Sequence, residues 1–129
     1  LYLPVDTPER RNGWYVFPIT LDIDAMQCDI AEFLTALSAE GAPCWKVFWP
    51  QCHTERAFQE HNGFGFSRFP FESKEYTDPR SADYSKVDVP NALWHQSRTF
   101  ITFIFPTYEP HHMEQIAEAI RKVIAAFAK

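Results

Sequence analysis

Residues 98–105, RTFITFIF, are the stretch that most constrains how this chain can fold. β-Branched and aromatic residues fill it, which favours an extended strand. Successive side chains of a strand point to opposite faces, and here both sets of side chains are almost entirely apolar. A run that is apolar on both faces is typical of a central strand covered on at least one side. The sequence therefore predicts a sheet with other elements packed on it.

Two helices are expected to provide that cover. The first should begin at Asp29, which precedes Glu32 by three residues as in a capping box. Its apolar residues repeat at helical spacing: Ile30, Phe33, Leu34 and Leu37. Gly41 is placed to end this helix in a left-handed conformation, and Pro43 prevents its continuation. The second helix should begin at Pro110. Its broad apolar stripe comprises Met113, Ile116, Ala117, Ile120, Val123, Ile124 and Phe127.

Shorter elements complete the predicted fold. Residues 14–21, WYVFPITL, predict a strand, and Pro18 within it predicts an edge position or a bulge, because proline cannot donate to the sheet. Residues 44–49 predict a second short strand, and residues 90–96 predict a short helix. The fold class is therefore α/β. We expect a small two-layer sandwich in which a short, mostly antiparallel sheet has helices packed on one face.

The remaining segments predict connections. Residues 1–13 indicate a linker from a missing N-terminal domain, and residues 14–129 indicate one small domain. The start without Met fits this expectation of a piece of a longer protein. Residues 59–86 predict a long polar and aromatic loop. Its turn signals are Asn62-Gly63, Phe69-Pro70 and Asp78-Pro79.

Composition excludes some functions. Aromatic residues make up 16% of the chain, so we expect some of them to cover an interface or line a pocket. A net charge of -5 argues against nucleic acid as the main partner. No apolar run approaches the length of about 18 residues that a membrane span needs. Three cysteines without repeated spacing and the lack of a recognisable signal peptide indicate a cytoplasmic protein.

Residues 41–58, GAPCWKVFWPQCHTERAF, concentrate the candidate chemistry. Six of these residues are candidates for binding a substrate: Trp45, Phe48, Trp49, Gln51, His53 and Arg56. The three aromatic residues could stack on a ligand ring or pack against another domain. We expect one face of their strand to be buried and the other to be available. The polar residues that follow could bind an anion or a hydroxyl group.

Other candidate sites have weaker support in the sequence. A metal site at Cys52, His53 and His61 lacks the CxxC or HxxxH spacing of known sites. A nucleophile formed by Cys52 or Cys44 with His53 is conceivable, but such partners are normally distant in sequence. Residues 62–66, NGFGF, contain GxG without a preceding strand, so a turn with two packing phenylalanines is favoured over a phosphate site.

His111 and His112 are expected in the solvated first turn of the last helix rather than as a ligand pair.

Taken together, four segments resemble the C-terminal small domain of the pyridoxal-phosphate-dependent sugar aminotransferases, the DegT/DnrJ/EryC1/StrS family. They are LSAEGAP at residues 37–43, FWPQCHTERAF at residues 48–58, VPNA at residues 89–92, and FIFP with the following helix at residues 103–123. Their order and spacing carry the resemblance. Many members have a His-Tyr-x-x-Pro-(L/I)-His loop where this chain has FWPQCH, so the resemblance does not imply a nucleotide-sugar substrate.

The resemblance implies that the parent protein transfers an amino group from an amino acid to a keto-sugar or keto-cyclitol. It also implies that pyridoxal phosphate (PLP) is held by the N-terminal large domain, that the parent is a homodimer, and that this fragment alone is inactive. The chemistry would belong to the cofactor. A free-standing protein-binding or regulatory α/β module is the alternative, and a small cysteine-dependent hydrolase is a remote one.

Overall fold

The computed structural model describes residues 1–75 and 83–129. The predicted turn at Asp78-Pro79 lies outside the described residues. The chain forms two compact units, one made of residues 1–48 and 93–129 and the other of residues 49–92.

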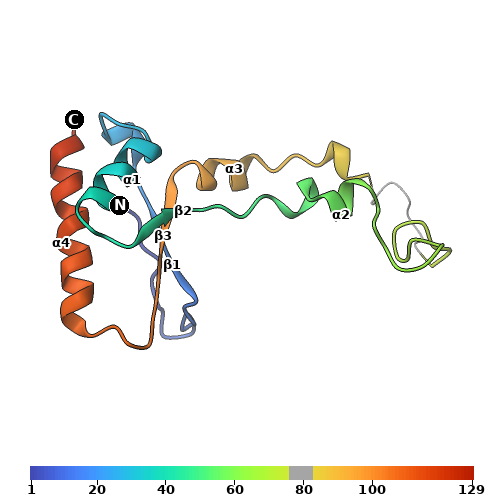
Figure 1. The fold of residues 1–129 in the computed structure, drawn as a ribbon, viewed down its shortest axis with the longest axis horizontal. Coiled ribbons are helices and arrows are strands. Elements are labelled where there is room, and N and C mark those ends of the chain that lie inside the picture. The colour runs from blue at the N-terminus through green and yellow to red at the C-terminus, as the bar shows by residue number, and fades with distance from the viewer. Residues whose placement is uncertain (76–82) are drawn as a thin grey trace. The chain divides into compact units, whose positions relative to one another are not determined.

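The first unit contains the sheet. Within the described residues three strands pair in the order β1-β3-β2, and both pairs are antiparallel. The strands are β1 (Val16–Thr20), β2 (Cys44–Lys46) and β3 (Thr99–Phe103). Figure 1 shows them crossing the body of this unit. The central position of β3 confirms the prediction from its two apolar faces. Pro18 lies in β1 at one edge, as its missing N–H group requires.

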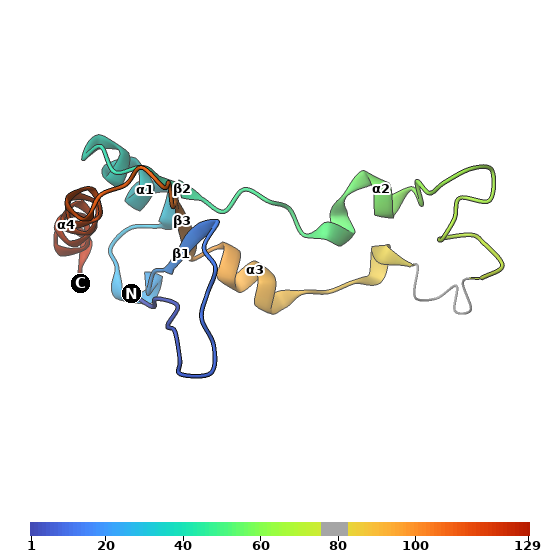
Figure 2. The same ribbon diagram turned by 90° about the horizontal axis from the view of Figure 1, so that it is seen from below.

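Two helices pack on one face of this sheet, α1 (Ile30–Ala39) and α4 (Pro110–Phe127). They lie side by side in both views (Figures 1 and 2). A short 3-10 helix, η1 (Ile23–Ala25), leads from β1 toward α1. The side chains buried between the helices and the sheet include Ile19, Leu21, Phe33, Leu37, Phe100, Ile116, Ile120 and Val123. The fold is therefore the small α/β sandwich that the sequence predicts.

The ends of α1 follow the sequence signals closely. The amides of Ala31 and Glu32 donate to the Asp29 carboxylate at 2.8 and 2.9 Å, and the Asp29 amide donates to the Glu32 carboxylate at 3.1 Å. These bonds satisfy free N–H groups of the first turn. Gly41 has a φ of 77°, the left-handed conformation that glycine adopts without a Cβ clash. The predicted capping box and the predicted glycine stop are both confirmed.

The second strand is shorter than predicted. Residues 44–49 were expected to be extended and to bury one face, but β2 ends at Lys46. The pairing with β3 stops where Lys46 meets Phe100. The expectation of one buried face is also wrong, because Trp45, Phe48 and Trp49 are 42%, 60% and 41% exposed. β3 begins at Thr99, so it offers little backbone beyond Phe100 with which a longer β2 could pair.

The second unit is built from short turns and helices. Its elements are η2 (Cys52–Thr54), α2 (Arg56–Gln59) and η4 (Tyr84–Lys86). The helix α3 (Pro90–Gln96) begins in this unit and ends in the first, and Pro90 opens it as predicted. Four rings contact one another at centroid distances of 5.1 to 6.3 Å: Phe58, His61, Phe71 and Tyr84. We call these four residues the ring cluster.

One prediction about this unit is wrong. Phe64 and Phe66 were expected to pack in their turn, yet they are 82% and 112% exposed. The turn itself is present, since the backbones of Phe64 and Phe69 form a bridge with N–O distances of 2.8 and 3.1 Å. A Cβ atom on Gly63 would lie 2.2 Å from the Phe69 carbonyl oxygen, so only glycine fits there. The tight turn brings backbones together and leaves both rings outside.

Candidate functional site

The six predicted substrate residues fall in both units. Trp45 and Phe48 belong to the first, while Trp49, Gln51, His53 and Arg56 belong to the second. Each group is therefore described with the unit that holds it.

Trp45 is part of an aromatic surface on the sheet face that points away from α1 and α4. Its ring meets the edge of Phe103 at a centroid distance of 5.2 Å. Tyr15 and Phe105 contact the same ring of Phe103 at 5.7 and 5.9 Å. We call these four residues the aromatic face. Tyr15, Trp45 and Phe105 are 71%, 42% and 46% exposed, so an apolar or ring-shaped partner can reach them.

The sequence pointed to Trp45 alone among these four. The other three lie outside residues 41–58, and only strand pairing brings them next to Trp45. The available signal was the alternation of β3, which places Phe103 and Phe105 on the face opposite Phe100. Phe48 is the last residue of the first segment of this unit. It lines a shallow hollow of about 450 Å³ together with Lys46, Val47, Leu93, Gln96 and Ser97.

The second-unit residues are fixed mainly through their backbones. The Gln51 carbonyl accepts from the amide and hydroxyl of Thr54 at 2.9 and 2.8 Å. The His53 carbonyl accepts from the Gln59 side chain at 2.5 Å. These bonds set the course of the chain from η2 into α2. The side chains of Gln51 and His53 are half-buried on this short scaffold.

Arg56 already has an acidic partner. Its Nε donates to the Glu60 carboxylate at 2.7 Å, one turn further along the chain. Two hydrogen bonds hold the pKa of the Glu60 carboxyl below its usual value. The bond from Arg56 has the larger effect and the bond from Asn62 the smaller one. An incoming anion would have to compete with Glu60 for Arg56. The guanidinium is 83% exposed, so that exchange needs no opening of the fold.

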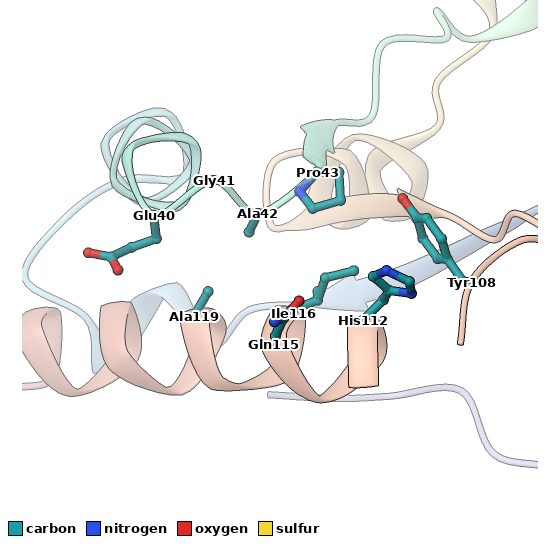
Figure 3. A pocket seen from close by; sticks show the side chains of 9 residues that line it. All are labelled: Glu40, Gly41, Ala42, Pro43, Tyr108, His112, Gln115, Ile116 and Ala119. Carbon is teal, nitrogen blue, oxygen red and sulfur yellow. The ribbon is translucent and has the colours of Figure 1, made fainter. Parts of the chain in front are cut away.

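A pocket that the sequence did not predict lies between the end of α1 and the first turns of α4. Its volume is about 410 Å³, within the usual range for small-molecule sites. We call it the polar pocket. It is lined by Glu40, Gly41, Ala42, Pro43, Tyr108, His112, Gln115, Ile116 and Ala119. Figure 3 shows Tyr108 and His112 at one end of the pocket and Glu40 at the other.

The polar groups of this pocket have defined partners. The Glu109 amide donates to Nδ1 of His112 at 3.0 Å, so the neutral ring carries its proton on Nε2. At the other end Lys122 donates to the Glu40 carboxylate at 2.6 Å. His111 is exposed as predicted, but His112 is half-buried, and the prediction of a solvated first turn is wrong for it. Tyr108 lies just before α4, and its ring contacts that of His112 at a centroid distance of 5.8 Å.

Two alternative chemistries can be compared with the structure. Among residues 1–75 and 83–129, no three His, Cys, Asp or Glu side chains are grouped to hold a metal ion. Burial raises the pKa of the Cys44 thiol to about 11, which keeps it protonated and poorly nucleophilic at neutral pH. Cys52 is exposed. In the part of the chain that the structure describes, no helix has the length and apolar character to cross a membrane.

Comparisons of the chain with protein-family models, with curated proteins and with solved structures found no match.

Proposed function

We propose that this chain is the small domain of a PLP-dependent aminotransferase that acts on a keto-sugar or keto-cyclitol. The parent enzyme would move an amino group from an amino acid to the keto carbon, and the donor would leave as a keto acid. The cofactor and the transfer chemistry would belong to a separate large domain. The role of this chain would be to form one wall of the substrate cleft.

The proposal is supported by the positions of the four resembling segments in the fold. Residues 37–43 form the end of α1, with Gly41 in the left-handed conformation. Residues 48–58 form the exposed segment from Phe48 into α2. Residues 89–92 contain the start of α3, and residues 103–123 join β3 to α4. Each segment thus has the backbone role that its residue types require, in the order that the resemblance implies.

The lysines of this chain do not fit the covalent site of PLP. A lysine that forms a Schiff base needs a lowered pKa, which burial or a neighbouring cation provides. Every described lysine is exposed. The hydrogen bond that Lys86 donates to the Asp83 carboxylate raises the pKa of Lys86, the opposite of the required change. Lys122 and Lys129 are held by Glu40 and by the Asp24 carbonyl. The proposal therefore assigns the cofactor to the large domain and no catalytic residue to this chain.

The proposed substrate wall consists of Trp45, Phe48, Trp49, Gln51, His53 and Arg56. Exposed aromatic rings can cover the apolar face of a sugar or cyclitol ring. Amide, imidazole and guanidinium groups can bond to its hydroxyl groups. The exposure of the three aromatic residues supports this role. The three free cysteines suit a reducing cytoplasm as the place where the enzyme works.

Two measurements test the proposal. When the purified chain is mixed with PLP near neutral pH, we expect no stable stoichiometric aldimine absorbance. Such a band would contradict the assignment of the cofactor to another domain. In the enzyme that includes the large domain, Trp49→Ala and His53→Ala should each raise KM for the keto substrate. Unchanged KM and rate in both variants would remove these residues from the substrate wall.

A free-standing protein-binding module is the second candidate, and the aromatic face favours it. Tyr15 and Phe105 lie outside the proposed substrate wall, yet both remain exposed beside Trp45. Exposed aromatic groups of this kind often mark protein contacts. Tyr15→Ala separates the two candidates. It should weaken the binding of a partner protein under this second function and should leave KM unchanged under the first.

A further inference from the structure

An apolar groove runs between the sheet and α4 in the first unit, and none of its lining residues belongs to the proposed substrate wall. Four residues of α4 line it at helical spacing, Met113, Ile116, Ala117 and Ile120. Phe17 and Ile19 of β1 form the opposite side. The remaining lining residues are Leu1, Leu3, Thr102 and Arg121. We call this set of ten residues the apolar groove.

The size of the groove limits its occupant. Its volume is about 240 Å³, below the range of about 300–1,000 Å³ for drug-sized ligands. Apolar cavities of about 150 Å³ in other proteins stay dry and bind benzene. A water molecule needs two to four polar partners, and only Thr102 and Arg121 among the lining residues have polar side chains. The groove is open to solvent, unlike those enclosed cavities, but its apolar lining offers water few hydrogen-bond partners and so favours one small apolar molecule.

Thr102 gives the groove a specific polar feature. It is 1% exposed, and its hydroxyl oxygen has no hydrogen-bond partner among the described residues. It lies on the helix-covered face of β3, opposite Phe17 in the register with β1. A buried hydroxyl without a partner destabilises the fold, so such a group calls for an explanation. The hydroxyl oxygen itself is buried, so an occupant with an oxygen atom near Thr102 would supply the missing hydrogen bond once the side chain turns its hydroxyl toward the groove.

We propose that the apolar groove binds a small apolar molecule, about the size of a substituted benzene ring, that carries one hydroxyl or carbonyl oxygen. The ring or chain lies between the α4 stripe and β1, and its oxygen pairs with the Thr102 hydroxyl. Arg121 is exposed, so its guanidinium stays hydrated. The occupant therefore does not have to carry a negative charge to pair with it. This site is independent of the proposed aminotransferase function.

The test uses benzyl alcohol and toluene as probes of the 129-residue chain, with binding followed by NMR titration. The two probes have similar shapes, and only benzyl alcohol has a hydroxyl group. Thr102→Val keeps the shape of the side chain and removes its hydroxyl. We expect this variant to bind benzyl alcohol about five- to tenfold more weakly than the wild type, as the loss of one hydrogen bond predicts. Its affinity for toluene should not fall.

A blocking variant locates the site. Ala117→Leu places a larger side chain in the groove, and leucine is itself a good helix former. This variant should abolish the binding of both probes. Ala125→Leu makes the same change at an exposed position of α4 that does not line the groove, and it should leave binding intact. Circular dichroism verifies that both variants fold.

Three results would overturn the proposal. The first is that neither probe binds the wild type. The second is that Thr102→Val weakens both probes equally, which would exclude the hydrogen bond. The third is that Ala117→Leu dissociates a dimer of the wild-type chain, which would assign the groove to a second copy of the chain.

Discussion

The two units differ most in what they bury. In the first unit Phe33, Leu37, Leu21 and Phe100 are all 0% exposed between the sheet and two helices. In the second unit no residue of the described segments 49–75 and 83–92 is fully buried. Its ring cluster is only half-buried, although it unites four aromatic groups. The first unit thus has a hydrophobic core, while the second has ring contacts at its surface.

This difference suggests separate roles: the first unit stabilises the fold, and the second carries most of the proposed substrate residues. Burial of apolar surface is the main source of folding free energy, so the first unit holds the fold. A region with few buried contacts opens at a small cost in free energy. Four of the six proposed substrate residues belong to that region, so they can adjust to a substrate without disturbing the core. The predictions below compare matched positions in the two units.

The largest contrast is expected between two phenylalanines. Phe100→Ala in β3 should lower the free energy of unfolding by about 3–5 kcal/mol, because it leaves a cavity in the core. Phe71→Ala in the ring cluster should lower it by less than about 1 kcal/mol, because Phe71 is half-buried and has little core around it. Urea unfolding followed by circular dichroism measures both. Equal losses would mean that the two units share one cooperative core.

The same contrast explains which features could be predicted from the sequence. The elements of the first unit carry strong local signals, such as the Asp29–Glu32 capping box, Gly41 and the two apolar faces of β3. These signals act within a few residues and agree with the global packing, so the strand order and the helix ends followed from them. Where the pairing with the neighbouring strand stopped, as it does after Lys46, the rest of the predicted strand did not form.

The candidate sites depend on contacts between distant segments. Tyr15, Trp45 and Phe103 meet only because β1 and β2 flank β3. The polar pocket joins Gly41 to His112, and no pattern along the chain indicates that pairing. Sequence patterns describe how one segment presents its side chains, whereas a pocket requires two segments in register. The stretch 41–58 contains the position where the chain leaves the first unit, and its role in substrate binding stays a prediction.

Cysteine reactivity provides the second contrast. Burial raises the pKa of Cys44 from 9.0 to about 11, which lowers its thiolate fraction at pH 8 by about a hundredfold. Iodoacetamide should therefore modify the exposed Cys52 rapidly and leave Cys44 unmodified in the folded protein. Mass spectrometry of the alkylated peptides measures the ratio, and the urea-unfolded chain is the control. Equal rates in the native protein would show that β2 opens readily.

The raised pKa of Cys44 also predicts a pH dependence. The unfolded thiol loses its proton at a lower pH than the folded thiol, so deprotonation stabilises the unfolded state first as the pH rises. The stabilisation by the neutral thiol is complete below pH 9 and is lost as the pH rises toward 11. Cys44→Ala should flatten this part of the stability curve relative to the wild type, and Cys52→Ser should not.

Helix caps give a smaller contrast. Asp29→Ala should lower the free energy of unfolding by about 1 kcal/mol, since two amides of α1 lose their acceptor. Glu55 occupies the same position at the start of α2 but makes no side-chain cap bond. Glu55→Ala should therefore change the stability by no more than about 0.5 kcal/mol. Thermal unfolding of the two variants compares them directly, and an equal loss would assign a capping role to Glu55.

The smallest contrast is between two ion pairs. Glu40 bonds to Lys122 at 2.6 Å and ties the end of α1 to α4, whereas Glu60 bonds to Arg56 within one short helix. Because the side chains of Lys122 and Glu40 are 67% and 32% exposed, the first pair should contribute about 0.2–1 kcal/mol. Glu40→Gln should lower the stability by that amount in low salt, and high salt should remove the difference because it screens the pair.

Glu60→Gln should leave the stability unchanged at any salt concentration, because the Arg56–Glu60 pair lies within one short helix and links it to no core element. Chemical denaturation at low and high salt provides the comparison. A salt-dependent loss in Glu60→Gln as large as that in Glu40→Gln would mean that α2 unfolds together with the first unit. The ion pairs would then report one cooperative structure, and the proposed substrate residues in the second unit would be as rigidly held as the core.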